Sequence, residues 1–213
     1  MKCEKEAMLL YAVTDRRWTG EQTLYEQVEC SLKGGVTCLQ LREKDLNDED
    51  FLKEALEIKS VCNEYRVPFI INDNVEVAVK CDADGVHIGQ CDMGVKKARE
   101  IVGDKMIIGV SAQTVEQALS AQADGADYIG VGTVFPTSTK LDADFVDYET
   151  LKNICNAVEI PVVAIGGINE SNISELSGSG VDGIALVSAI FAADDIEGEC
   201  VKLRKLSEKM IKA

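Results

Sequence analysis

One short pattern recurs four times along this chain, a small or polar lead-in followed by an alternating apolar run. The four copies return every 43 to 55 residues: GGVTCLQLR (34–42), ADGVHIGQ (83–90), GADYIGVG (125–132) and GVDGIALVS (180–188). They align at Thr37, Asp84, Asp127 and Asp182. Four more apolar runs lie between them: LLYAVTD (9–15), VPFIIND (67–73), MIIGVSA (106–112) and IPVVAIGG (160–167). Short apolar runs bounded by turn residues are typical of buried strands, so the pattern predicts eight strands.

The segments between these runs have helical periodicity. In segment 48–67, one helical face carries Phe51, Ala55, Ile58, Cys62 and Tyr65. Eight alternating strand and helix units in 213 residues predict an α/β fold, a (β/α)8 TIM barrel forming a single domain over residues 1–213. A doubly wound open sheet would have fewer strands and a glycine-rich turn after the first one, where this chain has VTDR.

Charge and composition exclude several kinds of partner. The formal net charge of −15 repels nucleic-acid phosphates, so we expect no nucleic-acid partner. No apolar run approaches the roughly 20 residues that cross a membrane, and the N-terminal segment lacks the features of a signal peptide. We therefore expect a cytoplasmic protein with no membrane partner. The eight cysteines form no C-x-x-C pair and are expected to be reduced and packed.

Polar and charged residues follow the predicted strands, where the active site of a (β/α)8 barrel lies. Those after the second to fifth strands are Arg42, Glu43, Lys44, Asn72, Asp73, Gln90, Asp92 and Ser111. Those after the last three strands are Thr137, Ser138, Thr139, Lys140, Gly166, Gly167 and Ser188. Independent exposure to solvent would not place such groups after successive strands, so we expect one shared mouth.

These groups suit anions and a hard cation. Asp73 and Asp92 follow adjacent strands, and two carboxylates with phosphate oxygens and water suit Mg²⁺. The local cations Arg42, Lys44 and Lys140 suit a diphosphate. Glycines after the seventh strand and a serine turn after the eighth match the usual barrel phosphate site. The set implies two phosphorylated substrates, or one substrate with a phosphate at each end.

Each feature has a simpler interpretation when taken alone. The charges of REKD (42–45) could be a solvated strand end, and Asp73 and Asp92 could be turn or cap residues. His87 is the only histidine and lies inside the fourth strand, so we expect it to pack or hydrogen-bond there and not to act as a general base. The conjunction of groups favours a binding site over these alternatives.

Seven motifs in order resemble the thiamine-phosphate synthase family. They are QLREK (40–44), IND (71–73), DGVHIGQCD (84–92), GVSAQT (109–114), GVGTVFPTSTK (130–140), VVAIGGI (162–168) and VSAI (187–190). The resemblance covers most of the chain. It implies a transferase that joins a thiazole phosphate, plain or carboxylated, to 4-amino-2-methyl-5-(diphosphooxymethyl)pyrimidine, giving thiamine phosphate and diphosphate.

The resemblance also implies roles for individual residues. The pyrimidine diphosphate would be held by Gln40, Leu41, Arg42, Glu43, Lys44, Asn72, Ser111 and Lys140, of which Arg42, Lys44, Ser111 and Lys140 would be catalytic. One Mg²⁺ ion per subunit would be bound by Asp73 and Asp92. The thiazole phosphate would be held by Thr137, Ser138, Thr139, Gly167, Val187 and Ser188. The oligomeric state stays open, although such barrels often pair as homodimers.

Related barrels provide the alternatives. Thiazole tautomerases share the thiazole-phosphate site but rely on a histidine in the position of Gln113, where many synthases also carry histidine. A non-catalytic binder of thiazole phosphate would not need the two aspartates. Other phosphate-handling barrels share the glycine turn but have no use for QLREK or the PTSTK loop (136–140). The residues present therefore favour the synthase.

Overall fold

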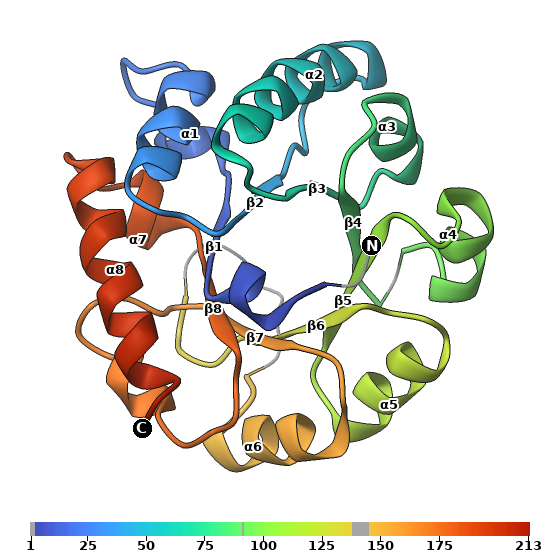
Figure 1. Ribbon diagram of the computed structural model, residues 1–213, viewed down its shortest axis with the longest axis vertical. Coiled ribbons are helices and arrows are strands. Elements are labelled where there is room, and N and C mark those ends of the chain that lie inside the picture. Colours follow the sequence, from blue (N-terminus) through green and yellow to red (C-terminus); the bar gives the residue numbers. More distant parts are fainter. Residues whose placement is uncertain (1–2, 91, 138–144) are drawn as a thin grey trace.

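The predicted barrel is present and closed. The computed structural model describes residues 3–90, 92–137 and 145–213. Eight parallel strands follow one another around the ring in chain order, and the last pairs with the first (Figure 1). They are β1 (Leu10–Val13), β2 (Cys38–Leu41), β3 (Phe69–Asn72), β4 (Gly85–Ile88), β5 (Ile107–Ala112), β6 (Tyr128–Val131), β7 (Val162–Ile165) and β8 (Gly183–Leu186). The predicted α/β class and (β/α)8 architecture are confirmed.

Helices surround the strands on the outside of the ring (Figure 1). They are α1 (Leu24–Lys33), α2 (Asp48–Tyr65), α3 (Val75–Lys80), α4 (Val95–Val102), α5 (Val115–Ala123), α6 (Tyr148–Ala157), α7 (Ser188–Phe191) and α8 (Ile196–Met210). Polar residues cap several of them. Thr23 forms a capping box with Glu26 at α1, and the Asn47 side chain accepts two backbone N–H bonds at α2. No helix among the described residues is both long and apolar enough to cross a bilayer.

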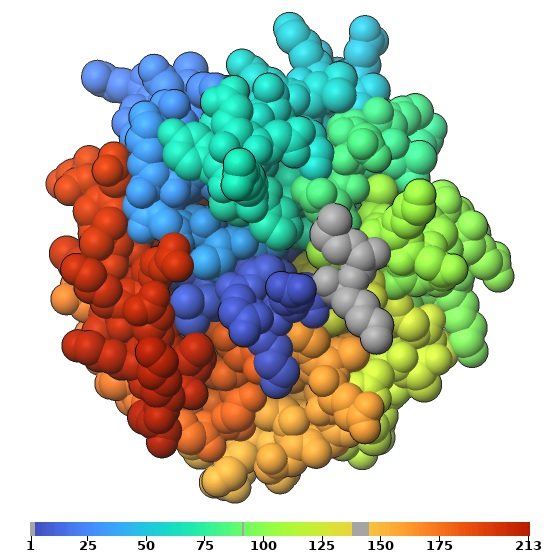
Figure 2. Space-filling model, viewed as in Figure 1, coloured from blue at the N-terminus to red at the C-terminus, as the bar shows by residue number. Residues whose placement is uncertain are grey.

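Two apolar clusters form the core. The larger lies between strands and helices and includes the predicted face of α2, where Phe51, Ala55, Ile58 and Cys62 are buried. The smaller gathers residues such as Met8, Tyr11 and Tyr128. Met8 belongs to the short helix η1 (Lys5–Met8), which lies over the centre of the ring and covers the middle of this face (Figures 1 and 2). Because η1 directly precedes β1, it closes the N-terminal end of the barrel.

The fourfold sequence repeat corresponds to a repeated pair of hydrogen bonds. In each copy the aligned residue makes two hydrogen bonds with one residue of the preceding strand. Its side chain accepts the backbone N–H of that residue, and its own backbone N–H donates to the carbonyl of the same residue. The four side-chain bonds run from Leu10 N to Thr37 Oγ1, Phe69 N to Asp84 Oδ2, Ile108 N to Asp127 Oδ2 and Val162 N to Asp182 Oδ2. The repeat thus satisfies backbone donors at the starts of alternate strands.

Candidate active site

An ion pair lies at the C-terminal ends of β2 and β3. The two strands are neighbours, so the residues that follow them meet. Lys44 Nζ lies 2.6 Å from Asp73 Oδ2. Asp73 has a left-handed backbone (φ 61°), and its N–H donates to the carbonyl of His87. The cap of α3 is the neighbouring Asn74, whose side chain accepts from Val77 N, so the Asp73 carboxylate is not used as a helix cap.

Arg42 occupies the same rim, beside β1. Its N–H donates to Thr14 Oγ1 at 3.0 Å, and its guanidinium lies 3.9 Å from Asp15 Oδ2. Asp15 is already paired with Arg17 at 2.6 Å, and the hydrogen bond from Arg17 lowers the pKa of this carboxyl below its ordinary value. The contact between Arg42 and Asp15 is long for an ion pair, so the Arg42 guanidinium can still bind an anionic ligand.

The ends of β4 and β5 carry the second carboxylate. Asp92 is exposed, and its Oδ2 accepts the N–H of Gly89 at 2.7 Å, which holds the turn after β4. Gln90 donates from Nε2 to the carbonyl of Ser111 at 2.6 Å. Gln90 and Asp92 also line a cavity of about 360 Å³ that extends toward Gln117 of α5.

The carboxylate oxygens of Asp73 and Asp92 are of the ligand type that Mg²⁺ prefers. Asp73 and Asp92 follow adjacent strands and are both accessible to solvent. Among residues 3–90, 92–137 and 145–213 no three histidine, cysteine or acidic side chains converge as a metal cage. Mg²⁺ is usually held by one or two carboxylates together with substrate oxygens and water, and Asp73 and Asp92 would be the carboxylates of such a site. Lys44 shares Asp73 with any such ion.

A glycine turn follows β7. Gly166 and Gly167 both have positive φ, and a Cβ on Gly167 would lie 2.4 Å from the carbonyl oxygen of Pro136. Only glycine allows this turn to pack directly against the segment after β6. The turn therefore lies beside the residue that precedes Thr137. Because β7 and β8 are paired neighbours, Val187 and the exposed Ser188 follow at the same edge of the barrel.

A line of polar side chains crosses the barrel interior. Gln40 Nε2 donates to Tyr11 Oη at 2.7 Å, and Tyr11 Oη lies 2.8 Å from Tyr128 Oη. His87 Nδ1 is 2.9 Å from Tyr128 Oη, and His87 Nε2 is 3.0 Å from Ser111 Oγ. The line thus joins two predicted substrate-binding residues, Gln40 and Ser111. His87 makes hydrogen bonds within the barrel, as its place inside a strand predicted.

Sequence comparisons with known proteins identify one family. The model of the family described as thiamine monophosphate synthase matches residues 10–190. The thiamine-phosphate synthase of Clostridium acetobutylicum is 52% identical over 188 residues, covering 88% of this chain and 89% of that protein. This chain belongs to the thiamine-phosphate synthase family. It is therefore an enzyme, a transferase of that family.

Two further relatives support the assignment. The thiamine-phosphate synthase of Clostridium tetani is 47% identical over 194 residues, covering 91% of this chain and 93% of that protein. The solved structure of thiamine phosphate pyrophosphorylase from Pyrococcus furiosus superposes with a TM-score of 0.90 at 40% identity, covering 97% of this chain and 98% of that one. The tautomerase and the non-catalytic binder are not favoured by these relatives.

Besides Gln40, two residues of the family motif QLREK have buried side chains. Leu41 is fully buried in the larger apolar cluster. The carboxylate of Glu43 is buried beside Arg16, at 3.2 Å, and near Glu54. Burial raises the pKa of Glu43 to about 7, the bonds from Arg16 oppose this rise, and the charge of Glu54 adds to it. Contacts from Leu41 to a ligand would have to come from its backbone.

The remaining predicted residues fall into two groups. Gln40 and Asn72 are buried at the ends of β2 and β3, while Thr137 and Ser111 are partly exposed. Ser138, Thr139 and Lys140, predicted for the loop after β6, lie outside the described residues. Gln113, which stands where many synthases carry histidine, donates its backbone N–H to Gln117 Oε1 at 2.7 Å at the entry to α5. That these residues bind the two substrates stays a prediction.

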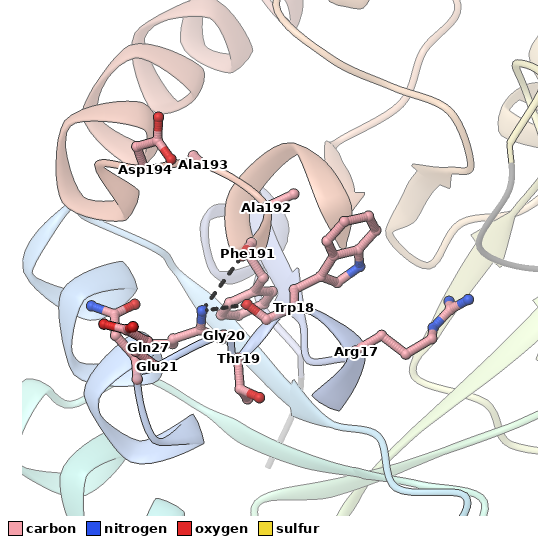
Figure 3. A pocket seen from close by; sticks show the side chains of 11 residues that line it. Arg17, Trp18, Thr19, Gly20, Glu21, Gln27, Phe191, Ala192, Ala193 and Asp194 are labelled. Atoms are coloured by element: carbon pink, nitrogen blue, oxygen red, sulfur yellow. Dashed lines mark hydrogen bonds between the residues drawn. The ribbon is translucent and has the colours of Figure 1, made fainter.

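Sequence reasoning did not find the cavity beside β1 and β8. A hollow of about 390 Å³ lies between the segment Arg17–Gln22 and the end of α7 (Figure 3). The buried Gln27 of α1 spans the two elements, because its Nε2 donates to the carbonyls of Trp18 at 2.9 Å and Phe191 at 3.5 Å (Figure 3). The contact with Phe191 links residues 164 positions apart, which periodicity along the sequence does not reveal.

Proposed function

We propose that this chain forms thiamine phosphate by joining 4-amino-2-methyl-5-(diphosphooxymethyl)pyrimidine to 4-methyl-5-(2-phosphoethyl)thiazole or its carboxylated form. Diphosphate is released, and the carboxylated form also loses carbon dioxide. The observation that supports this most strongly is the contact between Lys44 and Asp73 at neighbouring strand ends. It brings a cation suited to diphosphate beside a carboxylate suited to Mg²⁺.

The pyrimidine diphosphate is assigned to the β2–β5 side of the mouth. Arg42 and Lys44 neutralise the leaving diphosphate, together with Lys140, which is predicted from the sequence. Mg²⁺ held by Asp73 and Asp92 would supply further charge neutralisation when bound. Asn72 and Ser111 contribute polar contacts at the same edge. A well-neutralised diphosphate leaves without a protein nucleophile, which agrees with a mouth built from cations and hydroxyls.

The thiazole phosphate is assigned to the β6–β8 side. The backbone around Gly167 and the residues Val187 and Ser188 form the predicted phosphate site, with Thr137, Ser138 and Thr139 in the adjoining loop. The two sites share one barrel mouth, so the thiazole nitrogen can be placed in line with the pyrimidine methylene. Holding two reactants in line accounts for a large share of the acceleration in such reactions.

The direct test is product formation by the full chain. Both substrates are mixed with Mg²⁺, thiamine phosphate and diphosphate are quantified by chromatography, and a parallel sample contains a chelator. We expect the two products in equal amounts and a large loss of rate with the chelator. Folded protein that binds thiazole phosphate but forms no product with either thiazole form would overturn the proposal.

A further inference from the structure

The polar line inside the barrel is buried and made of groups that keep their protons. Tyr11 and Tyr128 are both almost fully buried, and Gly109 is required beside them because a Cβ there would lie 2.0 Å from the Tyr128 ring. Burial raises the pKa of both phenols well above the ordinary value. Each tyrosine therefore contributes one hydrogen to donate and an oxygen to accept.

The order of donors along the line follows from counting hydrogens. Gln40 Nε2 can only donate, so Tyr11 accepts from it. If Tyr11 donates to Tyr128, and Tyr128 to His87 Nδ1, every hydrogen has a partner and His87 carries its proton on Nε2. In the opposite order Tyr11 would accept two bonds, and its own hydrogen would be left with the sulfur of the buried Cys38. A thiol sulfur is a weaker acceptor than a hydroxyl oxygen, so the first order is favoured.

The first order has a consequence for Ser111. With the proton on Nε2, His87 donates to Ser111 Oγ at 3.0 Å, and the serine hydrogen is free to point elsewhere. Ser111 is partly exposed at the end of β5, on the rim assigned to the diphosphate. A phosphate oxygen at neutral pH accepts hydrogen bonds and has little to donate. A serine whose oxygen already accepts the Nε2–H of His87 can direct its own hydrogen to such a phosphate oxygen.

We propose that Tyr11, Tyr128 and His87 are positioning residues that form a directional hydrogen-bond chain from Gln40 to Ser111 and present the Ser111 hydroxyl as a donor to the diphosphate of the substrate. The identity of that substrate rests on the proposed function, whereas the direction of the chain does not. The three residues touch one another and the two ends of the line, and they act on the substrate only through Ser111.

The direction can be measured without substrate. His87 is the only histidine, so isotope-labelled histidine gives one set of imidazole signals by NMR. At a pH of about 8, above the usual titration range of histidine, the ¹⁵N shifts report the tautomer. We expect the proton on Nε2. A proton on Nδ1 would mean that the chain runs in the opposite direction, and it would overturn the proposal even if the enzyme forms thiamine phosphate.

Variants test the link to Ser111. In Tyr128→Phe, His87 Nδ1 no longer accepts a hydrogen bond, so we expect the ¹⁵N signal of Nδ1 to shift while the proton stays on Nε2. Tyr148→Phe is the matched control, because the Tyr148 hydroxyl donates to the Ser177 carbonyl at 2.7 Å, outside the barrel interior. It should leave the histidine signals unchanged. Unchanged signals in folded Tyr128→Phe would contradict the chain. If Tyr128→Phe does not fold, the tautomer of the wild type decides the direction.

Kinetics give the second readout. We expect Tyr128→Phe to lower kcat/KM for the pyrimidine diphosphate about 10-fold, as the loss of one well-formed hydrogen bond would. Ser111→Ala should lower it at least as much, and the double variant should show little further loss, because both changes remove the same contact. Losses that multiply in the double variant would show that Tyr128 acts independently of Ser111. If the wild type forms no product, the proposed function fails while the NMR result still decides the direction of the chain.

Discussion

Glu43 shows how a motif residue can serve the scaffold of a site. It follows the strand β2 among charges that the sequence assigns to the mouth, yet its side chain is only 2% exposed and contacts Arg16 of η2 (Arg16–Trp18). The sequence could not predict this, because Arg16 and Glu43 are 27 residues apart and meet only when η2 packs over β2. Its neighbour Lys44 instead extends to Asp73, at 2.6 Å.

The buried carboxyl of Glu43 predicts a pH dependence of stability. Its pKa is about 7 in the folded protein and 4.5 ordinarily, so the folded state binds more protons between these values. The free energy of unfolding should therefore fall as the pH rises from 4.5 to 7, by on the order of 2 kcal/mol. Glu43→Gln removes this titration. Urea unfolding across this range should show a flatter pH profile in the variant, and equal profiles would mean that Glu43 titrates normally.

Lys44 provides a prediction about binding. Its ion pair with Asp73 is exposed enough that Lys44→Gln should change the free energy of unfolding by at most about 1 kcal/mol. Because Lys44→Gln removes a positive charge that would contact the diphosphate, it should lower kcat/KM by about 10- to 100-fold. Lys80→Gln is a matched control, because Lys80 pairs with Glu76 on the surface of α3. Equal steady-state rates in the two variants would remove Lys44 from the site.

At the scale of elements, most of the barrel could be predicted. Each of the eight predicted apolar runs contains one strand, because a strand buried on both faces needs a nearly continuous apolar sequence. The crossover from β7 to β8 was less regular than the pattern indicates, since it holds the short 3-10 helix η3 (Ile173–Leu176). The closure of the barrel by helix η1 and the contact of Gln27 with Phe191 were not predicted, because they depend on how distant segments pack.

The aligned residues of the fourfold repeat are expected to contribute to the free energy of unfolding and not to catalysis. Asp84 accepts the N–H of Phe69 at 2.8 Å and pairs with Lys59 at 2.7 Å, at the end of the barrel opposite the mouth. Asp84→Ala should lower the free energy of unfolding by about 2 kcal/mol while leaving kcat/KM unchanged. Asp84→Asn keeps an acceptor oxygen and should lose less. A loss of activity in stable Asp84→Ala protein would contradict the separation of the two ends.

At the scale of the whole molecule, the chain is acidic but places cations at the mouth of the barrel. The chain carries a formal net charge of −15, yet Arg42 and Lys44 lie at the rim assigned to an anionic substrate. Charge and strand order predicted the position of this rim. They could not predict which rim groups contact one another, because the Lys44–Asp73 pair and the line from Gln40 to Ser111 depend on side-chain packing inside the closed ring.

Asp73 and Asp92 are proposed to act together as the Mg²⁺ site of this mouth. The most direct measurement is the Mg²⁺ concentration that gives half-maximal formation of thiamine phosphate in the wild type, Asp92→Asn and the control Asp82→Asn. Asp82 is an exposed residue between α3 and β4, at the opposite end of the barrel. We predict that Asp92→Asn needs about 10-fold more Mg²⁺ or loses activity altogether, while Asp82→Asn matches the wild type. An unchanged Mg²⁺ requirement and rate in folded Asp92→Asn would contradict the account.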